Sequence, residues 1–240
     1  IYLCLETKKI TIISFLVSIG FARLLRMQYF IFLTALFLSN NLLSEASKEP
    51  TQLPVIFAIV DVETTGLNPN YNEIIDIGLI LIDKDLNEIA RFNSKVLPLH
   101  PQRINSEARK INGFDLIAWK KENALSGEEA IKKLITFLSK LERKPYFIAF
   151  NSWFDSAFLS NLFRKHDYKF DHWFDYKVFD IPSMAMACGY FPEGDNFNDD
   201  LAKLLNVTPE TKNPLLHTGE SGVNYNYAIL KSLKKKECFF

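Results

Sequence analysis

The amino-acid sequence predicts an α/β domain built on a mixed β-sheet, with a three-strand meander flanked by helices. Three observations predict this class. Strand-like apolar runs follow one another early in the domain, with turn-rich segments between them. A capping-box segment then opens an apolar repeat at helical spacing. After it, helical and strand-like segments alternate, as they do in layered α/β proteins.

The meander is predicted from apolar runs at residues 54–62, 73–82 and 87–97, separated by GLNPNYN and DKDLN. The capping box begins at Ser126, and the repeat behind it predicts a helix to about Leu141. The other expected elements are a short helix and turn at 104–115, a buried strand at 146–150, and helices at 152–165, 198–205 and 226–236.

The chain is expected to have two parts, an apolar leader at residues 1–50 and a folded domain at residues 51–240. In the leader, apolar stretches at 10–22 and 29–39 flank a short basic segment, and neither reaches the roughly 20 residues that span a bilayer. The leader has three alternative interpretations. It is a secretory signal starting at Met27, a membrane anchor that contacts lipid through residues 10–40, or upstream or poorly ordered sequence.

The amino-acid composition and net charge limit the classes of function that the chain can have. The chain has 240 residues, 48% of them hydrophobic, and a formal net charge of zero. No global basic field therefore attracts nucleic acid, and any such binding must be local. The three cysteines are far apart in the sequence and indicate neither a disulfide framework nor a zinc site.

Acidic residues occur where apolar strands end. Asp61 and Glu63 lie two apart at the end of the first strand, so their side chains point to the same face. Asn151 and Asp155 lie four apart after the strand at 146–150 and share one helix face. Carboxylates this close suit Mg²⁺ or Mn²⁺. The structural alternative is that the acids cap a turn and a helix N-terminus in water.

The residues around these acids resemble the sequence motifs of a known family. VDVETTGLNP is similar to the first motif, D-x-E-T-T-G, of the DEDD-type 3′–5′ exonucleases, the DnaQ-like proofreading superfamily. FNSWFDSAFL is similar to the second motif, and the resemblance covers about residues 55–235. It implies a ribonuclease H-like fold. Phe150 is expected to be a core aromatic at the end of its strand, and Trp153 and Phe154 are expected to pack in the core, with stacking on a base as the alternative.

The resemblance also implies a two-metal site. Asp61, Glu63 and Asp155 would hold two Mg²⁺ or Mn²⁺ ions about 3.5–4 Å apart, and the terminal phosphodiester at a single-stranded DNA or RNA 3′ end would be cut. The residues expected to bind the terminal nucleotide are Thr64, Thr65, Gly66 and Asn151.

The third family motif, H-x-A-x-x-D, is degenerate. It supplies a general-base histidine and a fourth metal carboxylate, yet this chain has no aspartate after Asp200. The register chosen from the apolar pattern of 221–233 puts Ser221 in the histidine place and Asn226 in the aspartate place. His217 either substitutes for the base through a rearranged loop or is a solvated loop residue.

Three readings of function follow from this departure. The first is an active 3′–5′ exonuclease. The second is a catalytically silent relative that binds nucleic-acid ends or a protein partner. The third is a change of reading frame near residue 218, since the upstream residues match the family better. The expected location is cytoplasmic by resemblance, or exported or membrane-anchored if the leader is real. The sequence does not choose DNA over RNA and does not give an oligomeric state.

Overall fold

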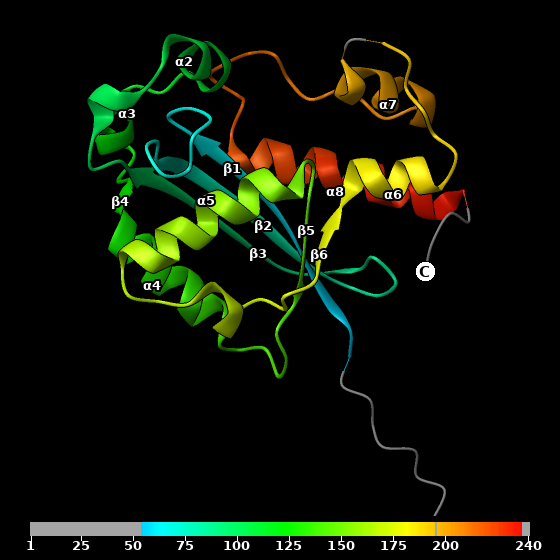
Figure 1. Ribbon diagram of the computed structural model, residues 1–240, viewed down its shortest axis with the longest axis horizontal. Helices are drawn as coiled ribbons and strands as arrows, with labels where there is room; N and C mark the ends of the chain where they lie inside the picture. The colour runs from blue at the N-terminus through cyan, green and yellow to red at the C-terminus, as the bar shows by residue number, and fades with distance from the viewer. Residues whose placement is uncertain (1–53, 195, 237–240) are drawn as a thin grey trace, which may run out of the picture. The chain divides into compact units, whose positions relative to one another are not determined.

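The computed structural model describes residues 54–194 and 196–236 (Figure 1). The predicted leader at residues 1–50 lies outside these residues and stays a prediction. Within the described ranges, no helix is both long enough and apolar enough to cross a membrane.

A six-stranded mixed sheet forms the centre of the domain, in the order β4-β3-β2-β1-β5-β6. β1, β2 and β3 are the predicted antiparallel meander, while β5 runs parallel to β1 and β6 parallel to β5. The strand bounds are β1 Ile56–Thr64, β2 Ile74–Asp83, β3 Glu88–Leu97, β4 Leu125–Ser126, β5 Tyr146–Ala149 and β6 Val178–Asp180.

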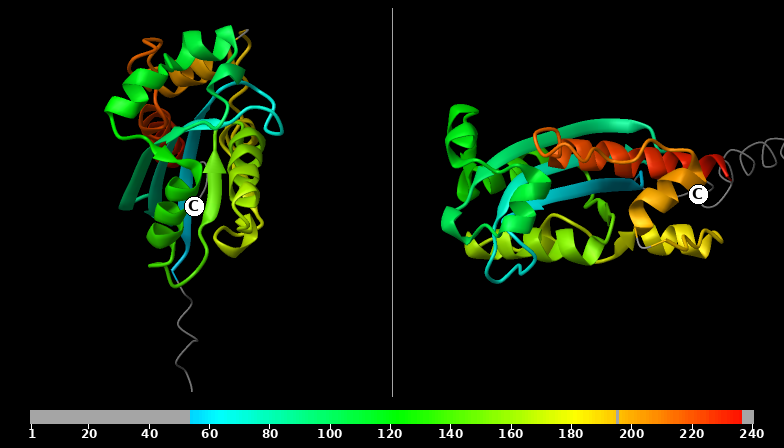
Figure 2. Two further views of the ribbon diagram at one scale, coloured as in Figure 1. Left: turned by 90° about the vertical axis from the view of Figure 1, so that its left-hand side faces the viewer. Right: turned by 90° about the horizontal axis from the view of Figure 1, so that it is seen from above.

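Helices cover both faces of the sheet (Figure 2). The helices are α2 Ser106–Asn112, α3 Leu116–Lys121, α4 Gly127–Leu138, α5 Ser152–Lys165, α6 Ile181–Ala187, α7 Phe197–Leu205 and α8 Gly219–Lys235, with short 3₁₀ turns η1 Pro101–Arg103 and η2 Phe170–His172. Side chains of α4 and α5 pack in one large hydrophobic cluster, and those of α6, α7 and α8 pack in the other. A third, smaller cluster contains Ile75, Phe114 and Trp119.

Strand β1 contributes to both clusters because its side chains alternate between the two faces. Ala58 and Val60 belong to the cluster under α4 and α5, whereas Phe57 and Ile59 belong to the cluster under α8. Asp61 and Glu63 continue the second series. The α8 face of the sheet is therefore the face on which these acids lie.

The predicted elements are present, but several boundaries differ. α4 ends at Leu138 rather than Leu141, and β6, α3 and α6 were not predicted. α8 begins at Gly219, seven residues before the predicted start at 226, because Thr218 and Ser221 form a capping box. The sequence spacing indicated no disulfide framework, yet Cys188, just after α6, is disulfide-bonded.

Candidate active site

Two carboxylates lie at the end of β1. Both Asp61 and Glu63 are within the strand, which continues to Thr64 and changes register against β2 between Glu63 and Thr64. Glu63 is buried, and Gly78 of β2 pairs with Asp61. Because Gly78 has no side chain, α8 packs directly against the backbone at this point: a Cβ on Gly219 would lie 2.4 Å from Gly78 N.

The third carboxylate comes from α5. β5 runs parallel to β1, so the two strands bring their C-terminal ends to the same edge of the sheet. The chain turns into α5 through Asn151, whose φ of 56° is left-handed. Asp155 then lies one turn into the helix, where its Oδ1 accepts a hydrogen bond of 2.9 Å from the Val62 backbone N–H. This bond joins two sequence motifs that lie 93 residues apart.

His217 lies across the pocket from these acids, immediately before α8. Its Nε2 is 3.2 Å from Glu63 Oε1, and its Nδ1 is 3.0 Å from the Thr211 carbonyl oxygen. When Nδ1 donates to that carbonyl, Nε2 is directed at the carboxylate cluster. The sequence alternative of a solvated loop histidine does not fit this position, since His217 is half-buried and contacts an expected metal ligand.

The start of α8 reads HTGESG over residues 217–222, which is the family spacing with glycine in the last place. A Cβ on Gly222 would lie 2.2 Å from Asp61 Oδ2, so this position faces the first carboxylate. His217 therefore takes the place of the family histidine, and Gly222 takes the place of the family aspartate.

Ser221 and Asn226 do not take the places that the sequence reading gave them. Ser221 Oγ accepts a hydrogen bond of 3.0 Å from the Thr218 N–H, as the partner in the capping box. Asn226 lies one turn beyond Gly222 and is buried, and its Nδ2 has no hydrogen-bond partner among the described residues. The register predicted from the apolar pattern of α8 is wrong, because the chain has a glycine where the family has an oxygen-bearing side chain.

A further acid, Glu210, contacts His217 from the loop between α7 and α8. Its Oε1 lies 3.5 Å from Ser221 Oγ and 3.8 Å from His217 Nδ1. Sequence reasoning missed this residue, since nothing in its local sequence marks it. Only the path of the loop brings it to the site.

The electrostatics of the cluster are those of crowded acids. Burial, then Asp155 and Glu63, raise the pKa of Asp61 well above its ordinary value. Burial also raises the pKa of Glu63 to about 7, although His217 opposes the rise. Across the described residues, no Lys or Arg forms an ion pair with these acids. A divalent cation is the charge that would relieve this repulsion.

The donor chemistry fits a hard divalent metal ion. Asp61, Glu63 and Asp155 offer carboxylate oxygens, which Mg²⁺ and Mn²⁺ prefer. As placed, no three His, Cys, Asp or Glu side chains of the described ranges converge in metal-binding geometry. The Asp61 carboxylate lies against Gly222 in the first turn of α8.

A pocket of about 380 Å³ opens over the acids, lined by Asp61, Glu63, Asn151, Trp153, Asp155 and His217 among others. A second pocket, of about 290 Å³, adjoins it and is lined by Thr64, Gly66, Leu67, Ile111, Asn112 and Phe154 among others. Trp153 is 68% exposed, so the expectation that it packs in the core is wrong. Phe150 and Phe154 do pack against the two hydrophobic clusters.

The loop after β1 is held by internal hydrogen bonds. Thr65 is buried, and its Oγ1 accepts a bond of 2.9 Å from the Glu73 N–H, so its hydroxyl faces away from both pockets. Asn112 Nδ2 donates to the Thr64 carbonyl at 2.9 Å. A Cβ on Gly66 would lie 2.7 Å from the Asn72 amide, so the glycine is required by the fold of the loop itself.

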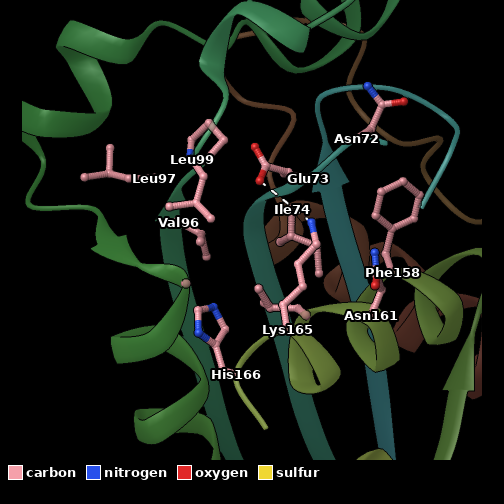
Figure 3. Close-up of a pocket in the computed structure, with 13 residues that line it drawn as sticks. Asn72, Glu73, Ile74, Val96, Leu97, Leu99, Phe158, Asn161, Lys165 and His166 are labelled. Carbon is pink, nitrogen blue, oxygen red and sulfur yellow. Dashed lines mark ion pairs between the residues drawn. The ribbon is translucent and has the colours of Figure 1, made fainter. Parts of the chain in front are cut away.

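α5 supports the far end of the same loop (Figure 3). Asn161 Nδ2 donates to the Pro69 carbonyl, and Lys165 Nζ lies 3.8 Å from Glu73 Oε1. Glu73 also accepts a bond of 2.8 Å from the His100 N–H. The cavity between these residues is about 30 Å³, enough for about one water molecule. We interpret it as structural support for the loop.

Comparisons with known proteins agree with this geometry. A family model described as an exonuclease, of the ribonuclease T type, matches residues 58–229. The ribonuclease T of Haemophilus ducreyi is 28% identical over 146 residues, covering 55% of this chain and 64% of that protein. The oligoribonuclease of Francisella tularensis subsp. novicida is 29% identical over 146 residues, covering 58% of this chain and 79% of that protein. The chain thus spans slightly less than two thirds of the ribonuclease T that it matches.

Solved structures share the fold. Exonuclease I of E. coli in complex with a dT13 oligonucleotide superposes with a TM-score of 0.65 at 18% identity, covering 76% of this chain and 42% of that chain. A 3′-exonuclease that recognises the histone mRNA stem-loop gives 0.61 at 17% identity, covering 78% and 84%. The predicted ribonuclease H-like architecture is confirmed.

Proposed function

Because the chain belongs to the exonuclease family that its residues 58–229 match, we propose that it is a 3′–5′ exonuclease acting on single-stranded DNA or RNA ends. The observation that carries the proposal is the meeting of Asp61, Glu63 and Asp155 with His217 around one pocket. The relatives include a ribonuclease T and an oligoribonuclease, and exonuclease I was solved with a DNA oligonucleotide. Both nucleic acids are therefore candidate substrates.

We assign roles to the residues as follows. Asp61, Glu63 and Asp155 would hold two Mg²⁺ or Mn²⁺ ions, which when bound supply Lewis-acid activation of a water molecule and stabilise the leaving oxygen. His217 Nε2 faces the cluster and takes the proton from the attacking water. The Thr211 carbonyl orients the ring by accepting from Nδ1. One terminal nucleotide leaves at each cleavage.

The neighbouring pocket suits the terminal nucleobase. Its lining is mainly apolar and includes Leu67, Ile111 and Phe154, with the Asn112 side chain at its edge. Trp153 lines the first pocket and is 68% exposed, so its ring is accessible to a bound nucleotide. Stacking of an aromatic ring on a base is tolerant of sequence.

A specific observation favours a second candidate. Gly222 stands where the family has its fourth metal carboxylate, and a glycine cannot bind an ion through its side chain. A catalytically silent protein that binds nucleic-acid ends through the same pockets is therefore the alternative.

The test is a nuclease assay on the full chain. A 5′-labelled single-stranded DNA or RNA oligonucleotide is incubated with Mg²⁺ or Mn²⁺, and shortening from the 3′ end is followed. We expect a ladder that Asp61→Asn weakens about 100-fold or more, because a metal ligand is lost. Asp85→Asn removes an equally negative but exposed side chain and serves as the control.

The outcomes separate the two candidates. A ladder that is equal in the wild type and in Asp61→Asn would come from a contaminating nuclease and would contradict the exonuclease. Binding of the oligonucleotide without shortening would establish the silent relative.

A further inference from the structure

We propose that Trp153 is the stacking platform for the nucleobase next to the terminal one, so that the site recognises two nucleotides at a 3′ end through two adjoining pockets. This inference rests on the proposed function and deepens it by naming which nucleotide Trp153 contacts. It arises from three observations: the boundary that the two pockets share, the place of the acids, and the way in which the Trp153 ring is held.

The two pockets meet at the end of β1. The first, of about 380 Å³, lies over the three acids, and the second, of about 290 Å³, is the one assigned to the terminal nucleobase. Both are lined by Val62, Glu63, Leu67 and Phe154. The pockets are therefore neighbours on one surface, and a carboxylate of the cluster lies at their common boundary.

The position of the cleaved bond assigns the first pocket. This bond joins the terminal nucleotide to the nucleotide before it, and it must lie over the acids because the metal ions that they would hold act on it. When the terminal base occupies the second pocket, the nucleotide on the other side of the bond lies over the first pocket. Among the described residues, Trp153 lines the first pocket but not the second.

The core holds the Trp153 ring in place. Trp153 is the second residue of α5, and it keeps 68% of its surface exposed. Its ring lies at 86° to that of Phe154, with the centroids 5.8 Å apart, and Phe154 packs against the buried Phe158 with a centroid distance of 4.7 Å. A ring that is already fixed loses little freedom when a base stacks on it, so the arrangement favours binding.

Two other roles for Trp153 give different results in a measurement. A single exposed apolar side chain is common on protein surfaces, and such a residue would not contact the substrate at all. Alternatively, Trp153 would stack on the terminal base, with the two pockets exchanged. The test must therefore measure whether the side chain and a particular base act on each other.

The experiment measures binding of three 5′-labelled single-stranded oligonucleotides to the full chain by fluorescence anisotropy. One is unmodified, one lacks the terminal base, and one lacks the base next to it. Ca²⁺ replaces Mg²⁺, and a gel verifies that the oligonucleotides stay uncut. We expect Trp153→Ala to weaken binding of the unmodified oligonucleotide by about 5- to 150-fold, the range found when base stacking on an aromatic ring is lost.

The three oligonucleotides complete a double-mutant cycle. Loss of the base next to the terminal one should weaken binding to the wild type by a similar factor, but should have little further effect in Trp153→Ala, because both changes remove the same contact. Loss of the terminal base should weaken binding equally in the two proteins. Trp153→Phe keeps an aromatic ring and should retain most of the affinity, which guards against a change in folding.

Tyr176→Ala is the matched control. Tyr176 lies two residues before β6 and is 80% exposed, yet it is not among the residues that line either pocket. Loss of this exposed aromatic side chain should leave the affinity for all three oligonucleotides unchanged.

Each outcome separates the inference from the proposed function. Independent effects of Trp153→Ala and of the missing base would overturn the inference, as would coupling of Trp153 to the terminal base. If the wild type shortens the oligonucleotide in Mg²⁺, such results overturn only the role of Trp153. The expected coupling in a wild type that binds without cleaving would support the inference and contradict the exonuclease alone. If the wild type neither binds nor cleaves, both fail.

Discussion

At the scale of single residues, the site keeps the arrangement expected for the family, but some family residues are replaced in this chain. The acids of β1 and α5 are where the sequence motifs place them. The residue at the start of α8 is a histidine that the apolar pattern of the helix concealed. Gly222 and Glu210 are the two residues whose meaning depends on what lies opposite them, Asp61 in one case and His217 in the other.

The prediction at this scale tests whether His217 or Ser221 is the general base. His217→Ala should lower the rate of 3′-end cleavage by about 10²–10⁴-fold, the usual effect of losing a general base. Ser221→Ala should leave the rate within a few-fold, because its hydroxyl serves the capping box of α8. Single-turnover assays on the same oligonucleotide measure both. A larger loss in Ser221→Ala than in His217→Ala would restore the register read from the sequence.

At the scale of elements, the close contact of α8 with the sheet decides the geometry of the site. The helix packs against β1 and β2 through glycines on both sides, so its backbone lies nearly in contact with that of β2. This approach brings the first turn of α8 over Asp61. It also leaves His217 in the loop just before the helix, within reach of Glu63.

The prediction for this contact concerns Gly78. A Cβ there would lie 1.9 Å from the Gly219 carbonyl oxygen, a backbone atom that cannot rotate away. Gly78→Ala should therefore force α8 off the sheet and lower the free energy of unfolding by about 3 kcal/mol or more.

Gly127→Ala is its control in urea unfolding. The new Cβ would meet the end of the His166 side chain, which is free to turn, so the change should stay within about 1 kcal/mol. A loss for Gly78→Ala as small as the loss for Gly127→Ala would contradict the prediction, because it would show that α8 can shift at little cost.

At the scale of the whole molecule, buried acids make the stability of the domain depend on pH. Asp76 of β2 is an example: it pairs directly with Glu63 of β1, so its side chain lies on the same face of the sheet as the candidate metal ligands. Burial raises its pKa from 3.8 to about 7, although Lys95 on β3 opposes the rise. Glu220 and Glu122, which also act on it, add to the increase.

The sign of the effect follows from proton binding. Below about pH 4 the group is protonated in both the folded and the unfolded states. As the pH rises towards 7, the unfolded state loses the proton first, so the free energy of unfolding falls. Asp76→Asn removes this titration. The variant should therefore gain a few kcal/mol over the wild type at pH 8 and lose that gain near pH 4. Urea unfolding of both proteins across this range is the measurement, and a difference that does not vary with pH would contradict it.

The leader also belongs to this scale. Whether residues 1–50 export or anchor the protein stays a prediction, which fractionation of cells that express the full chain would test.

The sequence by itself determined the fold class, the meander and the first three acids. These features depend on the local periodicity of apolar residues and on short sequence motifs whose residues lie close together in the chain. A strand alternates every two residues, so Asp61 and Glu63 had to share a face wherever β1 was placed.

Only the tertiary structure decided the rest of the site. The loop between α7 and α8 has no local pattern that places Glu210, and the start of α8 depends on how closely two backbones approach at Gly78 and Gly219. Such contacts join residues far apart in the chain, and their energies come from packing and charge in three dimensions. For this reason the position of His217 beside Glu63, and of Gly222 against Asp61, became visible only when β1, β2 and α8 were brought together.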